Sequence, residues 1–286
     1  RRERYRTLYI GVRIRPFQRR KGENVKKFLL AAALAASSVL PAGAQAVTTN
    51  GFPDNGLHPN VGAIMVPARS GVGYAEVCSG TLVSPTIFLT ASHCTAFLGA
   101  DPRPDYVTFD ETDIEPFPSG LIEATAVTNP AYRGGYKSDV SVMVLKTAAP
   151  ASIPLAQVPT TVGYLDTLGL DQKTKLTVVG YGTSEKIIVK GENGPQFPFE
   201  GDRGYGIGGF NALTSDALKM SQNAAHGDSG ACYGDSGGPT FLGAAPNDGD
   251  VVLAVTSTGD IPCYSTNVSS RTDTPSARAF LSEYGL

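Results

Sequence analysis

The chain has few charged residues and few histidines for its length. Asp, Glu, Lys and Arg make up 17% of its 286 residues, below the ~25% that is usual for a soluble domain. The 33 glycines and 20 prolines imply many turns, and the scarcity of charge leaves few charged helix faces. With 41% hydrophobic residues the chain can bury a core, which excludes intrinsic disorder. The composition therefore favours an all-β globular protein.

The four cysteines include no C-x-x-C pair. Its absence disfavours a zinc site or a thioredoxin-type redox site, so we expect no metal and no cofactor. An even number of cysteines in an exported protein is typical of disulfides. The four positions, which can pair in three ways, are Cys78, Cys94, Cys232 and Cys263.

The sequence also lacks an apolar run long enough for a transmembrane helix. Phe28–Leu40 has 13 uncharged residues, whereas a membrane span needs ~20. It follows Lys26-Lys27 and precedes Ala44-Gln45-Ala46, which is the pattern of a signal peptide cleaved after Ala46. A buried core helix is the alternative. We expect a secreted protein that begins at Val47 and has no membrane span.

Residues 1–24 do not fit in front of a signal peptide, because they begin with Arg and show no globular pattern. We expect residues 1–46 to be a leader in which 25–46 is the signal peptide. In this hypothesis Val25 is read as the initiator and 1–24 is an untranslated artefact. A basic extension of the signal peptide is the alternative, and the intact mass of the unprocessed precursor distinguishes the two.

Charge is unevenly distributed along the chain. Residues 1–27 hold 11 basic and two acidic residues, whereas 47–286 carries a net charge of −11. A body this acidic repels phosphate backbones, which excludes nucleic acid as a partner.

Short β-branched or aromatic runs, separated by Gly, Pro, Asn and Asp, indicate strands throughout 47–286. We expect Ala149–Thr161 to link two halves and 184–212 to form a long surface loop. A last helix is expected from Pro275, capped by Thr274 or Asp273. This many strands suggests barrels or a sandwich. The predicted strands are Val61–Val66, Ser79–Ser84, Thr86–Thr90, Tyr106–Phe109, Val140–Lys146, Lys175–Val179 and Val251–Thr256.

Two serines lie in motifs suited to nucleophilic catalysis: Ser229 in HGDSG and Ser236 in GDSGGP. A serine hydroxyl needs a neighbouring base, and the histidines available are His58, His93 and His226. Ser236 also fits the G-x-S-x-G nucleophile elbow of α/β-hydrolases, but those enzymes require a histidine after the serine and none follows here. The order His, Asp, Ser remains available.

Three segments resemble the trypsin/chymotrypsin-like serine peptidases. Leu89–Cys94 (LTASHC) resembles the T-A-A-H-C motif of that family, with Ser92 in place of the commoner Ala. Asp139–Leu145 (DVSVMVL) resembles its Asp-led strand, and Gly234–Pro239 (GDSGGP) matches its nucleophile motif in full. The similarity covers roughly residues 50–286, and secreted bacterial trypsin-like peptidases look closest.

The resemblance implies two packed six-stranded antiparallel β-barrels with a C-terminal helix, the first over about 47–160 and the second over about 161–286. It assigns the general base to His93, the orienting acid to Asp139 and the nucleophile to Ser236. The backbone N–H groups of Gly234 and Ser236 should form the oxyanion hole.

Of the three disulfide pairings, the local one is favoured, because each bridge would then staple one motif. Cys78–Cys94 would pin the His93 turn to the preceding strand. Cys232–Cys263 would tie the nucleophile loop to a wall of the specificity pocket.

Two positions depart from the family pattern. Where trypsin-like members carry a pocket-floor Asp, six residues before the nucleophile, this chain has Gly230, although the nearby Asp228 could reach inward. The wall Ser257-Thr258-Gly259 keeps the pocket open. An open pocket without a floor charge is expected to favour medium to large apolar or aromatic side chains.

The second departure concerns activation. The family's N-terminal I-V-G-G is missing, although Asp235, the partner of the amino group that this segment supplies, is present. The nearest match is Val47–Gly51. We expect signal removal, with or without one further trimmed residue, to free an amine at Val47 or Thr48 that inserts beside Asp235.

The sequence thus predicts a secreted, monomeric serine endopeptidase acting on proteins or peptides. A catalytically silent homologue that serves as a binding module is the alternative, and an esterase of another fold is contradicted by the histidine order. His226 and Ser229 are interpreted as a loop without catalytic function, and His58 as the cap of a surface turn.

Overall fold

The computed structural model describes residues 47–286 except Thr49, 101–102 and 185–200. The predicted leader therefore lies outside the described residues, as does most of the first part of the predicted 184–212 loop. None of the helices in the described part of the chain is both long and apolar enough to cross a membrane.

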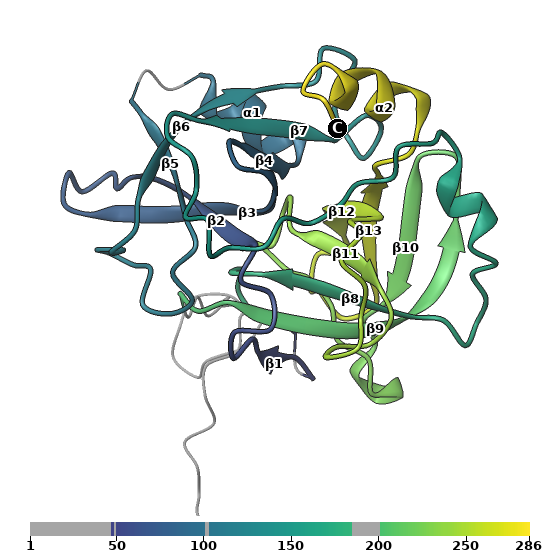
Figure 1. The fold of residues 1–286 in the computed structure, drawn as a ribbon. Helices are drawn as coiled ribbons and strands as arrows, with labels where there is room; N and C mark the ends of the chain where they lie inside the picture. The colour runs from purple at the N-terminus through teal and green to yellow at the C-terminus, as the bar shows by residue number, and fades with distance from the viewer. Residues whose placement is uncertain (1–46, 49, 101–102, 185–200) are drawn as a thin grey trace, which may run out of the picture. The chain divides into compact units, whose positions relative to one another are not determined.

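Six antiparallel strands form a first closed barrel in the order β2-β3-β4-β7-β6-β5 (Figure 1). The barrel closes where β5 pairs back onto β2, with Ile64 opposite Val107. Helix α1 (Ser92–Leu98) follows β4 directly. The strands are β2 (Val61–Pro67), β3 (Tyr74–Ser84), β4 (Ile87–Thr90), β5 (Asp105–Thr108), β6 (Ile122–Val127) and β7 (Ser141–Leu145).

A second sheet orders its strands β1-β9-β10-β13-β12-β11-β8, and an added β8–β9 pairing closes six of the seven into another barrel. The short strand β1 (Phe52–Pro53) lies on the outside, paired with β9. The six barrel strands are β8 (Lys175–Gly180), β9 (Gly204–Leu213), β10 (Ala217–Ser221), β11 (Pro239–Leu242), β12 (Ala254–Gly259) and β13 (Thr266–Arg271).

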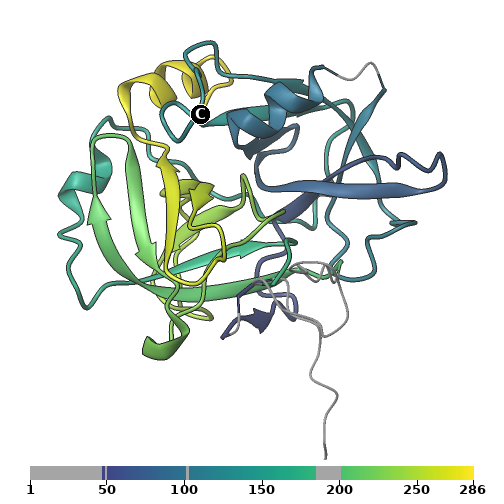
Figure 2. The ribbon, with the colours of Figure 1, turned by 180° about the vertical axis from the view of Figure 1, so that it is seen from behind.

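This architecture is the predicted all-β pair of six-stranded barrels with a C-terminal helix. Helix α2 (Pro275–Ser282) begins with proline at its first position, and Thr274 caps it by accepting a hydrogen bond from Ala277 N–H at 3.2 Å. Figures 1 and 2 show α2 at the same end of the molecule as α1. Phe280 and Leu281 of α2 are buried in the largest core cluster.

The core cluster that contains α2 draws residues from both barrels. Val61 and Leu89 come from the first barrel, and Val179 and Phe241 come from the second. Shared burial of this kind gives one continuous apolar interior between the barrels. The predicted linker Ala149–Thr161 runs between β7 and the 3₁₀ helix η1 (Tyr164–Thr167) without a strand of its own.

The expectation that 184–212 is a surface loop is wrong for its last part, because β9 occupies Gly204–Leu213. Two of its glycines, Gly206 and Gly208, are required by close packing. A Cβ added at Gly206 would lie 2.9 Å from the nitrogen of Gly230, and one at Gly208 would lie 2.0 Å from the carbonyl oxygen of Ser221. The strand therefore uses glycine where other backbone passes too close for a side chain.

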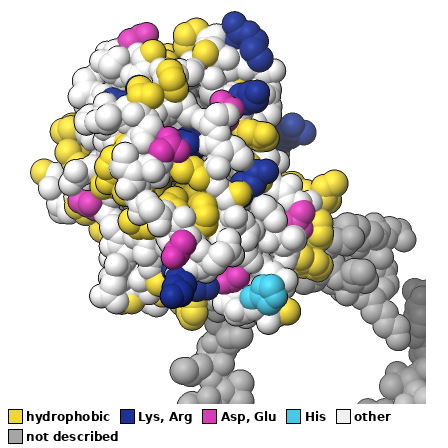
Figure 3. All heavy atoms as spheres, turned by 90° about the vertical axis from the view of Figure 1, so that its right-hand side faces the viewer, with side chains coloured by type: hydrophobic (Ala, Val, Ile, Leu, Met, Phe, Trp, Pro, Cys, Tyr) yellow, Lys and Arg dark blue, Asp and Glu magenta, His cyan; other side chains and the backbone are white. Residues whose placement is uncertain are grey.

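On the face shown in Figure 3, acidic and basic side chains lie interspersed with apolar ones. The 3₁₀ helix η2 (Ala224–His226) connects β10 to the segment that precedes the GDSGGP motif.

Candidate active site

His93 and Asp139 are brought together by the pairing of β4 with β7. Thr90 at the end of β4 lies opposite Ser141 at the start of β7, so the first turn of α1 meets the residues that lead into β7. The Nδ1 atom of His93 lies 2.9 Å from Oδ2 of Asp139, and the backbone N–H of His93 donates to Oδ1 at 2.8 Å. Asp139 is fully buried.

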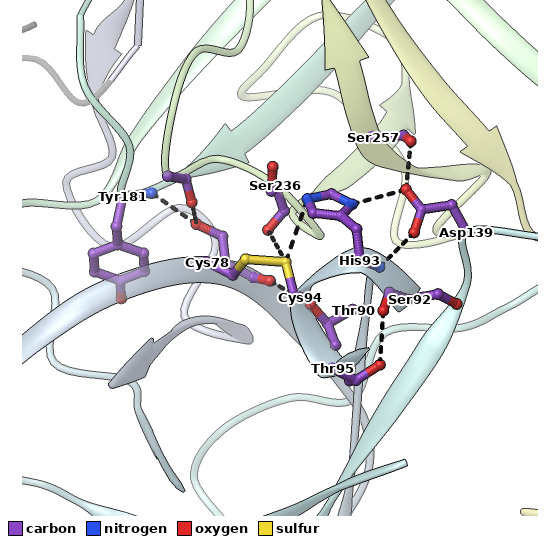
Figure 4. Close-up of a disulfide and its surroundings, with 12 residues drawn as sticks. Cys78, Thr90, Ser92, His93, Cys94, Thr95, Asp139, Tyr181, Ser236 and Ser257 are labelled. Carbon is purple, nitrogen blue, oxygen red and sulfur yellow. Dashed lines mark hydrogen bonds and ion pairs between the residues drawn. A yellow bond between two sulfur atoms is a disulfide. The ribbon is translucent and has the colours of Figure 1, made fainter. Parts of the chain in front are cut away.

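A third group orients the Asp139 carboxylate. The hydroxyl of Ser257, on β12 of the second barrel, donates to Oδ2. Figure 4 shows Ser257, Asp139, His93 and Ser236 following one another across the site, with the imidazole between the carboxylate and the serine. Both barrels therefore contribute to one polar cluster.

Ser236 lies in the loop that precedes β11. Its carbonyl accepts a hydrogen bond from Ser79 N–H of β3 at 2.8 Å, which fixes this loop against the first barrel. Among the described residues no hydrogen bond joins the Ser236 hydroxyl to His93, whose Nε2 lies 3.6 Å from Sγ of Cys94. Hydrogen bonds between a catalytic serine and its histidine are often long in the absence of substrate and shorten when substrate binds.

The backbone N–H groups of Gly234 and Ser236 have no hydrogen-bond partner within the described part of the chain. Gly234 has φ +98°, a conformation that favours glycine. A Cβ there would lie 2.7 Å from Cα of Gly182 and 2.9 Å from Oε2 of Glu76. The two amides are thus available to an incoming oxygen.

A cavity of about 550 Å³ opens beside His93 and Ser236. Of the four residues predicted to form the pocket, Ser257, Thr258 and Gly259 line this cavity, whereas Gly230 does not. The space next to Gly230 is filled by Gln222, whose Oε1 would lie 2.4 Å from a Cβ at position 230. The lining also includes Val77, Phe97, Ala231, Tyr233, Thr256, Asp260, Ile261 and Asn267.

Asp260 and Asn267 are lining residues that the sequence did not single out. Asp260 accepts backbone N–H groups from Tyr264, Ser265 and Thr266 at 2.9, 3.0 and 2.7 Å. Burial alone would raise the pKa of Asp260, but these donors hold it below its ordinary value. No sequence motif signals such a contact, because it depends on how the loop after β12 turns back.

Asp228 does not reach into the cavity. Its Oδ1 accepts a hydrogen bond from Nζ of Lys175 at 2.8 Å. The side chain is buried next to β8 and β9. The neighbouring Ser229 is buried too, and its hydroxyl accepts Ile207 N–H at 2.8 Å. His226 of the same motif is exposed on η2, whereas Asp228 and Ser229 are buried against β8 and β9.

Asp235, which precedes Ser236 in the nucleophile loop, is buried and accepts hydrogen bonds from Gly182 N–H and Cys232 N–H, both at 2.8 Å. Burial raises the pKa of Asp235 to about 7, against the lowering effect of these donors. Val47 is 1% exposed. The N–H of Thr48 donates to Gly230 O at 3.1 Å, so the segment after Val47 is docked on the chain just before the nucleophile loop.

Both expected disulfides are present. Cys78–Cys94 joins β3 to α1, and Cys232–Cys263 joins the nucleophile loop to the loop after β12. Within the described residues, the cluster of potential metal ligands is formed by Cys78, His93 and Cys94. Its two sulfurs are bonded to each other, which removes the thiolates that a metal would need.

The expectation that His58 caps a surface turn is wrong. His58 is buried, with Nδ1 2.5 Å from Oδ1 of Asp54 and Nε2 3.1 Å from Oδ2 of Asp248. Its ring also stacks on Phe241 at 5.8 Å between centroids. The side chain therefore serves the packing of the second barrel and lies outside the candidate site.

Comparison with known proteins gives a consistent result. A family model described as trypsin matches residues 57–279. A curated protein named trypsin, from Saccharopolyspora erythraea, is 27% identical over 214 residues, which cover 71% of this chain and 82% of that protein. Neuropsin, a serine protease expressed in the limbic system of mouse brain, has a similar structure, with a TM-score of 0.60, 18% identity, and coverage of 82% of this chain and 99% of that chain. The structure of HL collagenase has a TM-score of 0.59 at 16% identity and covers 86% of this chain and 98% of that chain.

Proposed function

The chain belongs to the trypsin family of serine proteases, and we propose that it is a secreted serine endopeptidase that cleaves peptide bonds through an acyl-enzyme intermediate. The observation that carries the proposal is the contact of His93 Nδ1 with the buried Asp139 carboxylate at 2.9 Å, beside Ser236. This is the arrangement that a histidine needs in order to act as a base toward a serine hydroxyl.

In this mechanism His93 takes the proton of the Ser236 hydroxyl as the oxygen attacks the substrate carbonyl. It then returns that proton to the leaving amine. Asp139, held by Ser257 and by the backbone N–H of His93, keeps the proton on Nδ1 and stabilises the imidazolium. In the second half of the reaction, His93 takes a proton from water as the water oxygen attacks the acyl carbonyl; the bond to Ser236 Oγ then breaks, and His93 returns the proton to Oγ.

The oxygen of the tetrahedral intermediate is proposed to bind the N–H groups of Gly234 and Ser236. Both amides have no partner among the described residues. Fixed donors of this kind stabilise the developing charge without reorganisation, and loss of one donor typically costs about 10²–10³ in rate.

We propose that the cavity accepts medium to large apolar or aromatic side chains. Gly230 supplies no charge, and the lining carboxylate, that of Asp260, is bonded to three backbone N–H groups. A basic side chain would therefore meet no unpaired acid at the position where trypsin-like members have one. Profiling with a substrate library is the test, and cleavage dominated by Arg and Lys would overturn this preference.

The N-terminus is proposed to arise by removal of residues 25–46 as a signal peptide. Docking of Thr48 on Gly230 and burial of Val47 support insertion of the new amine beside Asp235. An amine there would stabilise the Asp235 carboxylate, which is otherwise buried without a side-chain partner among the described residues. N-terminal sequencing of the exported protein tests the cleavage site.

The experiment that tests the catalytic proposal is labelling of the mature protein with a fluorophosphonate, which reacts with an activated serine. We expect label on the wild type and none on Ser236→Ala, with turnover lost by about 10⁴–10⁶. Absence of label on a folded wild type would favour the alternative, a silent homologue that binds peptides without cleaving them.

A further inference from the structure

The hydroxyl of Ser92 makes contacts that the proposed mechanism does not use. Ser92 precedes His93 at the start of α1 and is completely buried. Its Oγ donates to the carbonyl oxygen of Ser138 at 3.0 Å and lies 2.7 Å from Oγ of Ser141. One side chain therefore joins the histidine turn to the backbone before Asp139 and to a side chain after it.

The direction of each hydrogen bond follows from the number of protons. Ser92 has one hydroxyl proton. Because the Ser138 carbonyl can only accept, Ser92 donates this proton to the Ser138 carbonyl oxygen. Ser141 must then donate its own proton to Ser92 Oγ. The N–H of Asn129 donates to Ser141 Oγ at 3.0 Å, so both hydroxyls are satisfied and the network has a single arrangement.

The Ser138 carbonyl belongs to the peptide bond that leads into Asp139. Ser138 has φ 55°, a left-handed conformation that is uncommon for residues other than glycine. A backbone in this conformation persists where surrounding contacts hold it. The Ser92 hydroxyl is such a contact, and it holds the peptide plane from which the Asp139 side chain starts.

We propose that Ser92 is a positioning residue, which sets the Asp139 carboxylate relative to His93 through its hydrogen bond to the Ser138 carbonyl. The inference rests on the proposed function of the site. It assigns a role to the position at which the histidine motif departs from the family pattern. Alanine would remove this donor from the partly buried carbonyl of Ser138.

The test is Ser92→Ala, assayed with a chromogenic peptide substrate and with active sites counted by fluorophosphonate titration. A displaced carboxylate weakens stabilisation of the transition state, so we expect kcat per titrated site to fall about tenfold while KM changes less than about twofold. A residue that acted only on stability would lower the number of sites and leave kcat per site unchanged. That outcome would overturn the inference.

Two further variants isolate the bond. Ser141→Ala leaves Ser92 bonded to Ser138, so kcat per site should stay within about threefold of wild type; a tenfold fall would contradict a role for the Ser138 contact. This holds even where Ser92→Ala does not fold. Thr177→Val removes a buried hydroxyl that donates to Gly243 O at 3.0 Å in the second barrel, and it should leave kcat unchanged. Failure to label wild-type Ser236 would instead refute the proposed function.

Discussion

At the scale of single residues, Gly230 lies outside the lining of the cavity beside Ser236, and Gln222 fills the space next to it. The side chain of Gln222 occupies the space that a larger residue at 230 would need, with its Oε1 2.4 Å and its Cβ 2.6 Å from a Cβ at that position. An Asp or Glu at position 230 would have to displace the buried side-chain amide of Gln222. Substitution of Gly230 alone is therefore not expected to place a charge in the cavity.

We predict that Gly230→Asp lowers the free energy of unfolding by about 1–3 kcal/mol, the usual cost of overpacking, and does not create cleavage after Arg or Lys. Urea unfolding and substrate profiling measure the two effects. The double variant with Gln222→Ala makes room and should recover part of the stability. A stable single variant that cleaves after Arg would show that Gln222 moves freely.

Single residues were predictable where a motif fixes their neighbours. The LTASHC and GDSGGP motifs predict His93 and Ser236, and the structure places both on one cavity, with the buried Asp139 in contact with His93. The prediction for His58 is wrong because two of its contacts, Asp248 and Phe241, are more than 180 residues away and are known only from the folded chain. Contacts between distant segments carry no local sequence signal.

At the scale of elements, the histidine turn is held to its barrel by one covalent bridge. Cys78 of β3 and Cys94 of α1 are separated by 16 residues, so the disulfide closes a short loop that contains β4 and His93. The bridge reduces the conformational entropy of the unfolded chain. Its contribution to the free energy of unfolding therefore grows with the logarithm of the loop length.

We predict that Cys78→Ser with Cys94→Ser lowers the free energy of unfolding by about 3 kcal/mol, the loss that loop entropy gives for a loop of this size. Chemical denaturation under non-reducing conditions measures it. The pair Cys232→Ser and Cys263→Ser, with a separation of 31 residues, is the matched comparison and should lose slightly more. Equal stability of the first double variant and wild type would contradict the estimate.

Elements with a regular pattern were predicted from the sequence, and those built on glycine were not. Helix α2 was indicated by Pro275 behind a capping residue, and the structure selects Thr274 as the cap. Strand β9 was assigned to a loop, since Gly204–Gly209 has low β propensity. Gly206 and Gly208 are required by the backbone of Gly230 and Ser221, which packs against them and which the local sequence cannot reveal.

At the scale of the whole molecule, a buried charge network joins segments that are far apart in the sequence. Asp54 is fully buried and accepts Nε of Arg203 at 2.8 Å as well as the His58 ring. On its other side the His58 ring contacts Asp248 at 3.1 Å. The segment that leads from the proposed N-terminus into the first barrel is therefore tied to Arg203, just before β9, and to the loop after β11.

This network predicts a stability that depends on pH through His58. Burial alone would lower the pKa of His58, but hydrogen bonds and Coulombic attraction from Asp248 and Asp54 raise it to about 9. The pKa of the unfolded histidine is about 6.5. Because the folded value is the higher one, the stabilisation is complete below pH 6.5 and is lost as pH rises through about 9.

We expect the free energy of unfolding of the wild type to fall by about 3 kcal/mol between pH 6.5 and 9.5, since each pKa unit corresponds to ~1.4 kcal/mol. Urea unfolding at intervals across this range measures it, and His58→Gln should flatten the curve because no titrating ring remains between Asp54 and Asp248. His226→Gln is the matched control: His226 is exposed on η2, so its loss should leave the slope as in wild type. Parallel curves for wild type and His58→Gln would mean that the contacts of His58 with Asp54 and Asp248 do not cause the pH dependence of stability.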